Sequence, residues 1–189
     1  MHWHGTRKSE GIREILDSIA AMPLVMRQLA PVQICTWLGL FCMWLYFPVA
    51  VAHHVFGATD PHSELYTEGV AWGGLCFGMY SAVCFAFSLL LEKIACRFGR
   101  RRTHAMCLLA GALGLLSVAV IHDKYFLLLS MTGIGIAWAS TLSMPYAMLA
   151  GSLPADKVGV YMGIFNFFIV IPQLVAASVL GFLLRVRWC

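Results

Sequence analysis

The hydrophobic pattern of the chain consists of long apolar runs separated by short polar segments. The five runs are residues 32–51, 69–91, 105–121, 125–153 and 158–184. None of the runs contains Asp, Glu, Lys or Arg. A helix needs about twenty mostly apolar residues to cross a bilayer, so the pattern predicts an all-α integral membrane protein with five transmembrane helices. Residues 122–124 and 154–157 are such short connections that the helices they join must be antiparallel.

The segment before the first run has a different pattern. In Gly11–Ala21 apolar residues recur at helical spacing, and Pro23 follows. This pattern predicts a short amphipathic helix that lies along the membrane interface. A helix packed on a soluble partner is the alternative. We therefore divide the chain into a cytoplasmic segment, residues 1–29, and a transmembrane half-domain, residues 30–189.

The stretch Leu91–His104 holds the densest positive charge of the chain, around Gly99. Basic clusters of this kind often bind nucleic acid, but here uncharged runs flank the cluster on both sides, which indicates a loop between membrane spans. Positive charge in short loops stays in the cytoplasm. With the N-terminus inside, ten of the thirteen basic residues are cytoplasmic, and the exceptions are Lys124, Arg185 and Arg187. The sequence thus predicts a multi-pass protein of the plasma membrane, or of the inner membrane in a bacterium.

Composition supports a protein embedded in lipid. Hydrophobic residues make up 60% of the chain and charged residues only 12%, which lies outside the range of soluble domains. The net charge of +4 is concentrated in loops, so we expect the lipid bilayer to be the partner and no nucleic acid. The seven cysteines form no CxxC pair, and they are interpreted as small apolar packing residues.

Neutral polar and aromatic residues inside the runs are the candidate binding groups. They are Gln33, Trp37, Trp138, Asn166 and Gln173. Amides bond hydroxyl groups, and aromatic rings pack on the apolar face of a sugar, so this set suits a neutral polyol. The alternative is that the amides bond neighbouring helices and the rings anchor the protein at the membrane interface.

Prolines and glycines suggest where helices bend and where they approach one another. Pro145 and Pro172 lie deep inside their runs, where each removes a backbone donor and should kink its helix. The spacings Gly74–Gly78 and Gly159–Gly163 predict close helix contacts.

The chain shows no pattern that indicates an enzyme. Three histidines and two acids near residues 53–64 could collect a metal, but their spacing is not diagnostic. There is no nucleophile elbow, phosphate loop or carboxylate pair. We therefore assign no catalytic residue, no metal and no cofactor. With no charged residue in the runs, the sequence also offers no obvious proton carrier inside the membrane.

The motif RFGRRR that follows the second run resembles the cytoplasmic loop signature of the major facilitator superfamily. Arg97, Gly99, Arg100 and Arg101 match the signature, and Cys96 stands where the signature has an acid. The resemblance implies that Arg97, Arg100 and Arg101 cap helix ends and latch a gating loop.

Three further stretches resemble one branch of that superfamily, the sucrose:proton symporters and the related glycoside carriers. GVYMGIFNFFIVIPQ, with Gly163, Asn166, Pro172 and Gln173, is similar to their eleventh helix. SMPYAMLA and YTEGVAWGG are similar to the end of the tenth helix and the start of the eighth.

The resemblance implies that the five runs are helices seven to eleven of a twelve-helix fold. The expected function is symport of a disaccharide or glycoside, such as sucrose or maltose, with a proton by alternating access. The expected partners are the sugar, protons, the bilayer and an absent N-terminal half. A sugar sensor or regulatory partner without transport, or an inactive remnant, is the alternative.

Overall fold

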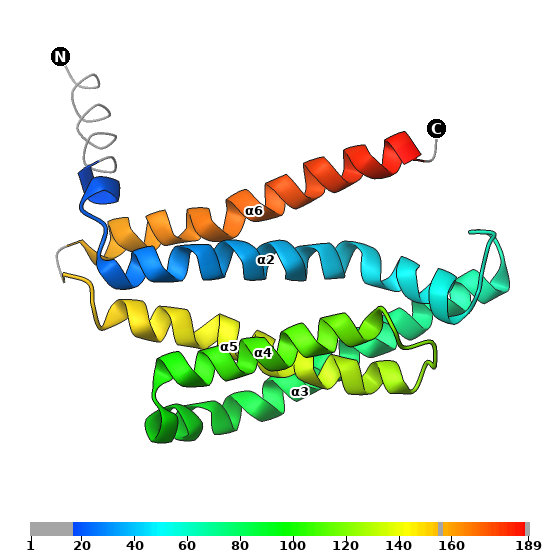
Figure 1. The fold of residues 1–189 in the computed structure, drawn as a ribbon, viewed down its shortest axis with the longest axis horizontal. Helices are drawn as coiled ribbons and strands as arrows, with labels where there is room; N and C mark the ends of the chain where they lie inside the picture. The colour runs from blue at the N-terminus through cyan, green and yellow to red at the C-terminus, as the bar shows by residue number, and fades with distance from the viewer. Residues whose placement is uncertain (1–16, 155–156, 188–189) are drawn as a thin grey trace, which may run out of the picture. The chain divides into compact units, whose positions relative to one another are not determined.

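The computed structural model describes residues 17–154 and 157–187, and this part of the chain is almost entirely helical (Figure 1). Residues 17–20 form a short helical stretch, and the longer elements follow. They are α2 (Leu24–Ala50), η1 (Val51–Val55), α3 (Glu64–Phe98), α4 (Arg100–Val118), α5 (Phe126–Ala150) and α6 (Val158–Arg187). The predicted all-α fold is therefore confirmed. Most of the predicted interfacial helix, Gly11–Ala21, lies outside the described residues.

Four helices of the described part are long and apolar enough to cross a membrane. They are Leu24–Val55, Glu64–Phe98, Phe126–Ala150 and Val158–Val179. The predicted number of five spans is wrong by one, because α4 does not meet the same criterion. Its first three residues are arginines and it ends at Val118, so its apolar part is shorter than the roughly twenty residues of a typical span.

The connection between the first two spans is shorter than the sequence suggested. Residues 52–68 were expected to form a loop, but the π-helical turn η1 continues α2 as far as Val55. The helix α3 then begins at Glu64, where the side chain of Ser63 caps it by accepting a hydrogen bond from the Tyr66 amide. Only residues 56–63 remain non-helical. The apolar pattern missed both ends because both helices continue into polar residues, such as His53 and His54 in η1 and Glu64 and Glu68 in α3.

The chain groups into two compact units. The first unit comprises Met1–Phe41 and Leu149–Cys189, and the second comprises Cys42–Met148. In the first unit, α6 buries a helical stripe that includes Tyr161, Phe165 and Ile169. The Tyr161 hydroxyl donates a 3.3 Å hydrogen bond to the carbonyl of Ala21, which ties α6 to the segment before α2.

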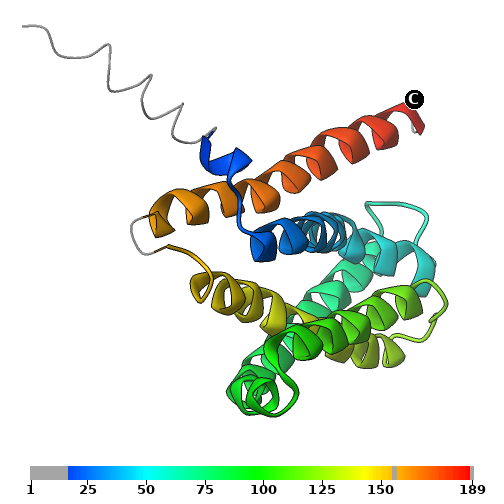
Figure 2. The same cartoon turned by 60° about the vertical axis from the view of Figure 1, so that its left-hand side comes forward.

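The second unit contains α3, α4 and α5, which lie side by side in both views (Figures 1 and 2). Glycines make this close packing possible. A Cβ atom at Gly114 of α4 would lie 2.6 Å from the Ser130 carbonyl oxygen of α5. A Cβ atom at Gly135 of α5 would lie 2.6 Å from the Tyr80 carbonyl oxygen of α3. Side chains at these positions would push the helices apart.

The two glycine spacings chosen from the sequence are not the ones that pack. A Cβ atom added at any of these four glycines would meet no atom of the described structure within 4 Å. The four are Gly74, Gly78, Gly159 and Gly163. Instead Gly69 and Gly73 pack against the backbone of Ala52 and Pro48. The Gly69–Gly73 and Gly74–Gly78 spacings both lie on α3, so the glycine pattern alone could not tell which face of this helix is covered.

Candidate functional site

Gln33 and Trp37 lie one turn apart on the buried face of α2. Gln33 is only 1% exposed, and Trp37 is 9% exposed. Neither the amide nitrogen nor the amide oxygen of Gln33 has a hydrogen-bond partner among the described residues. A buried amide normally satisfies its several hydrogen-bonding sites, so this side chain is poised to bond a group that the described chain does not supply.

Asn166 and Gln173 belong to the same unit but lie off the buried stripe of α6. Asn166 is exposed and Gln173 is half-buried. Two turns of helix separate them, so their amides project from neighbouring positions on one side of α6. An amide exposed on a helix of membrane-crossing length needs a polar surface or another helix opposite it. These two residues therefore mark the polar side of α6.

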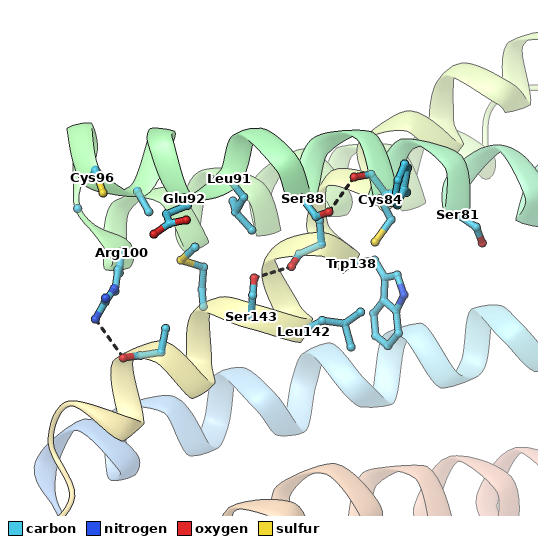
Figure 3. A pocket seen from close by; sticks show the side chains of 16 residues that line it. Ser81, Cys84, Ser88, Leu91, Glu92, Cys96, Arg100, Trp138, Leu142 and Ser143 are labelled. Atoms are coloured by element: carbon cyan, nitrogen blue, oxygen red, sulfur yellow. Dashed lines mark hydrogen bonds between the residues drawn. The ribbon is translucent and has the colours of Figure 1, made fainter.

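Trp138 lies in the second unit, where it lines a groove of about 930 Å³ between α3 and α5. Its ring meets that of Trp44 in a T-shaped contact with 5.0 Å between centroids. Figure 3 shows Glu92, Cys96 and Arg100 at one end of the groove and Ser81 and Trp138 toward the other. The groove thus combines an aromatic wall, serine hydroxyls and one charged end.

The basic turn joins α3 and α4 through a single residue, Gly99. Its φ of 84° and ψ of 144° place it in a region that residues with a side chain rarely adopt. Arg100 reaches across to α5 and donates a 3.1 Å hydrogen bond to the Ala147 carbonyl (Figure 3). That carbonyl lies in the last turn of α5, where helices lack internal donors and favour cations. Arg97 and Arg101 are exposed.

The two prolines lie inside continuous helices. Pro145 is buried within α5 and Pro172 within α6. The hydroxyl of Thr141, four residues before Pro145, donates a 2.8 Å hydrogen bond to the carbonyl of Ala137. The predicted kinks remain predictions.

Two arrangements in the second unit were not found from the sequence. His104 of α4 is 5% exposed, and its Nδ1 shares a 2.8 Å hydrogen bond with Ser140 Oγ of α5. At the other end of α4, the ammonium of Lys124 lies over three aromatic rings, those of Phe56, Trp72 and Tyr125. His104 precedes the third apolar run directly, and this position was the only signal for it. Among the described residues no cluster of His, Cys, Asp and Glu is suited to hold a metal ion.

Comparison with known proteins gives three informative relatives. The chain is 27% identical over 191 residues to Sucrose transport protein SUC3 of Arabidopsis thaliana, covering 86% of this chain and 32% of that protein. It is 24% identical over 134 residues to Solute carrier family 45 member 3 of Macaca fascicularis, covering 67% and 24%. It is 26% identical over 154 residues to Proton-associated sugar transporter A of Mus musculus, covering 77% and 20%. The chain therefore spans at most about a third of the length of these relatives.

Helices of membrane-crossing length that carry amides and aromatic residues define a multi-pass helical membrane protein. The family model of the Major Facilitator Superfamily matches residues 13–188, and the chain belongs to this family. The resemblance found in the basic turn and in the stretch GVYMGIFNFFIVIPQ of α6 is thereby confirmed at the level of the family.

Proposed function

We propose that the chain supplies part of the substrate pathway of a sugar carrier, which moves a disaccharide or related glycoside together with a proton by alternating access. The observation that carries this proposal is the buried amide of Gln33, which has no partner among the described residues and lies one turn from Trp37. A sugar hydroxyl would satisfy the amide, and the indole offers an apolar surface to the sugar ring. Two relatives are named as a sucrose transport protein and a proton-associated sugar transporter, which supports this substrate class.

The other candidate residues fit the proposal in different ways. Asn166 and Gln173 present amides on the polar side of α6, where they can bond further hydroxyls. Trp138 offers an aromatic wall in the groove of the second unit. Arg100 holds the end of α5 through Ala147, a contact suited to a latch that closes and opens. In the proposed carrier the chain works together with a first half that completes the pathway.

We also propose an orientation in which the Gly99 turn and the N-terminus face the cytoplasm of a cell with the protein in its plasma membrane. The support comes from charge. In α3 and α4 the arginines gather at the turn, whereas Asp60, Glu64 and Glu68 lie at the opposite end of α3. Basic residues are retained on the cytoplasmic side of the membrane.

The decisive experiment is uptake of labelled sucrose and maltose by cells that express the complete proposed carrier, with and without a proton uncoupler. We expect Gln33→Leu to reduce uptake about tenfold, the equivalent of one hydrogen bond of about 1.4 kcal/mol, while membrane insertion is unchanged. Gln28→Leu is the matched control, because Gln28 is an exposed amide on the same helix. We expect Asn166→Leu to impair uptake as well.

The results separate the alternatives. Equal uptake by the Gln33→Leu and Gln28→Leu variants would remove Gln33 from the site. Uptake that the uncoupler leaves unchanged would contradict proton coupling. Sugar binding without uptake would contradict the carrier and favour a sugar sensor. If the cells showed no sugar binding and no uptake, the proposed substrate class would be overturned.

A further inference from the structure

Among the described residues, the buried histidine of α4 has a hydrogen-bond partner on one side of its ring only. His104 lies in the second turn of α4, and its Nδ1 and the Oγ of Ser140 share a 2.8 Å hydrogen bond. Ser140 is fully buried, and His104 is 5% exposed. The opposite ring nitrogen, Nε2, is buried and has no hydrogen-bond partner among the described residues. Within the described part of the chain, the ring is thus held by one hydrogen bond between two helices, and its Nε2 is buried without a partner.

This arrangement can hold a neutral imidazole but not a protonated one. A neutral ring has one donor and one acceptor nitrogen, and the Ser140 hydroxyl can serve either role toward Nδ1. A protonated ring has an N–H on both nitrogens. The second N–H would then be buried with a positive charge and no acceptor, which is strongly unfavourable.

Neighbouring groups do not offset that charge. On α4, Arg100 and Arg101 precede His104 by about one turn and repel a proton, and Cys107 follows in the buried core. On α5, no Asp, Glu, Lys, Arg or His occurs between residues 126 and 150, so Ser140 is the polar group that faces the ring. The helix α3 joins this layer through Leu91 and Ala95. Of its titratable residues near this layer, Glu92, Lys93 and Cys96 are exposed, and Cys84 is half-buried and packs against the same core.

We propose that His104 is a proton-binding site and that proton uptake opens the contact between α4 and α5. The described arrangement holds the neutral ring. A second arrangement, in which Nε2–H reaches water or an acceptor, holds the protonated ring. Because protons bind the second arrangement better, acidification must shift the population toward it. His104 lies one helical turn beyond the arginines of the Gly99 turn. A movement of α4 at His104 would therefore also affect the hydrogen bond from Arg100 to the Ala147 carbonyl.

This inference rests on the proposed function for its role in transport, where His104 would carry the coupled proton. The sequence offered no such group, because the five apolar runs contain no Asp, Glu, Lys or Arg. The proton site itself is tested without any sugar, so its test does not depend on the outcome of the transport experiments.

The first measurement is the titration of the histidine rings in the purified full chain by nuclear magnetic resonance of isotope-labelled histidine. His104→Gln assigns the His104 signal, and His104→Asn does so if the first variant fails to fold. We expect the pKa of His104 to lie below that of an exposed imidazole, because burial disfavours the charged ring. His122→Gln is the control for an exposed histidine. A His104 signal that shows no protonation of the ring down to the lowest pH at which the protein stays folded would overturn the proposal.

The second measurement follows the opening of the contact. Cys107 is buried one turn after His104, whereas Cys96 on α3 is exposed. The ratio of Cys107 to Cys96 labelling by a small thiol reagent is read by mass spectrometry. Because the thiolate is the reactive form, acidification slows labelling of both cysteines, and the ratio cancels this shared effect. We expect the ratio to rise severalfold on acidification in the unmodified chain and to stay constant in His104→Gln. A constant ratio in the unmodified chain would overturn the coupling of proton uptake to opening.

Uptake assays on the full-length carrier then separate this site from the proposed function. Titration and opening without sugar transport would leave the proton site intact and refute the carrier. For a working carrier, the proposal requires His104→Gln to abolish accumulation of sugar against its gradient while exchange of sugar across the membrane persists. Accumulation unchanged in that variant would overturn the role of His104 in coupling.

Discussion

Lys124 contacts Trp72 through both its side chain and its backbone carbonyl. The ammonium Nζ of Lys124 lies 5.1 Å from the centroid of the Trp72 ring, and the indole N–H donates a 2.9 Å hydrogen bond to the Lys124 carbonyl. The same ammonium lies 5.4 Å from the ring centroid of Phe56 and 5.7 Å from that of Tyr125. This cage joins the loop after η1, the start of α3 and the turn before α5. The cage gives a structural reason for Lys124, which is one of the three basic residues that the sequence pattern does not place on the cytoplasmic side.

We expect the cage to stabilise the second unit through cation–π contacts more than through its ion pair. The Nζ of Lys124 is 3.8 Å from Glu68 Oε1, but the Glu68 side chain is 60% exposed, so the pair contributes little. Lys124→Met should lower the free energy of unfolding by about 1.5–3 kcal/mol, since it removes three cation–π contacts that each contribute roughly 0.5–1 kcal/mol at exposed sites. Thermal unfolding in detergent measures this, with Glu68→Gln and exposed Lys93→Met as near-neutral controls. A larger loss in Glu68→Gln than in Lys124→Met would contradict this ranking.

Two glycines of α3 provide a matched test of helix packing. A Cβ atom at Gly69 would lie 2.5 Å from Ala52 Cα, whereas one at Gly74 would meet nothing within 4 Å. Gly69→Ala should therefore destabilise the chain by about 1–3 kcal/mol, the usual cost of overpacking. Gly74→Ala should be neutral or stabilising by up to about 1 kcal/mol, because alanine favours helix more than glycine does. Unfolding midpoints in detergent compare the two variants, and equal midpoints would show that α3 does not pack on η1 as described.

The sequence pattern predicted the helices well because a bilayer imposes length and apolarity on each span. Apolar runs located α2, α3, α5 and α6, and Pro23 marked where α2 begins. The pattern overcounted the spans at α4, since the three arginines that begin this helix leave its apolar part too short. It also ended the α2 helix too early and began α3 too late at residues 52–68, where the helical backbone continues beyond the apolar runs.

The side-chain partners could not be predicted, because they depend on which helix faces are covered. The sequence placed Gln33 and Trp37 on one face of α2, and both are buried. It could not show that Asn166 would be exposed while Gln33 has no partner among the described residues. Nor could it bring His104 to Ser140, which lie 36 residues apart in the chain. Such pairs require tertiary contacts that spacing along one helix does not encode.

Gly99 tests whether the backbone of the basic turn matters apart from its charge. Its φ is 84°, while open space surrounds the position that a Cβ atom would take. Gly99→Ala should therefore lose about 1–3 kcal/mol through backbone strain alone. Gly78→Ala is the matched control, since Gly78 is equally open but lies within α3, away from its ends. Detergent unfolding measures both variants. If Gly99→Ala were as stable as Gly78→Ala, the turn would adopt another backbone conformation.

The orientation of the chain can be decided by labelling the two ends of α3. Cys96 lies exposed beside the arginines at one end, and Thr59 lies exposed in the loop at the other. Single-cysteine variants that retain Cys96 or carry Thr59→Cys are treated with a membrane-impermeant maleimide, before and after the cells are permeabilised. Because basic loops stay in the cytoplasm, we expect Cys96 to react only after permeabilisation and Thr59→Cys to react in intact cells. The reverse pattern would invert the topology, and it would remove the gating role proposed for Arg97, Arg100 and Arg101.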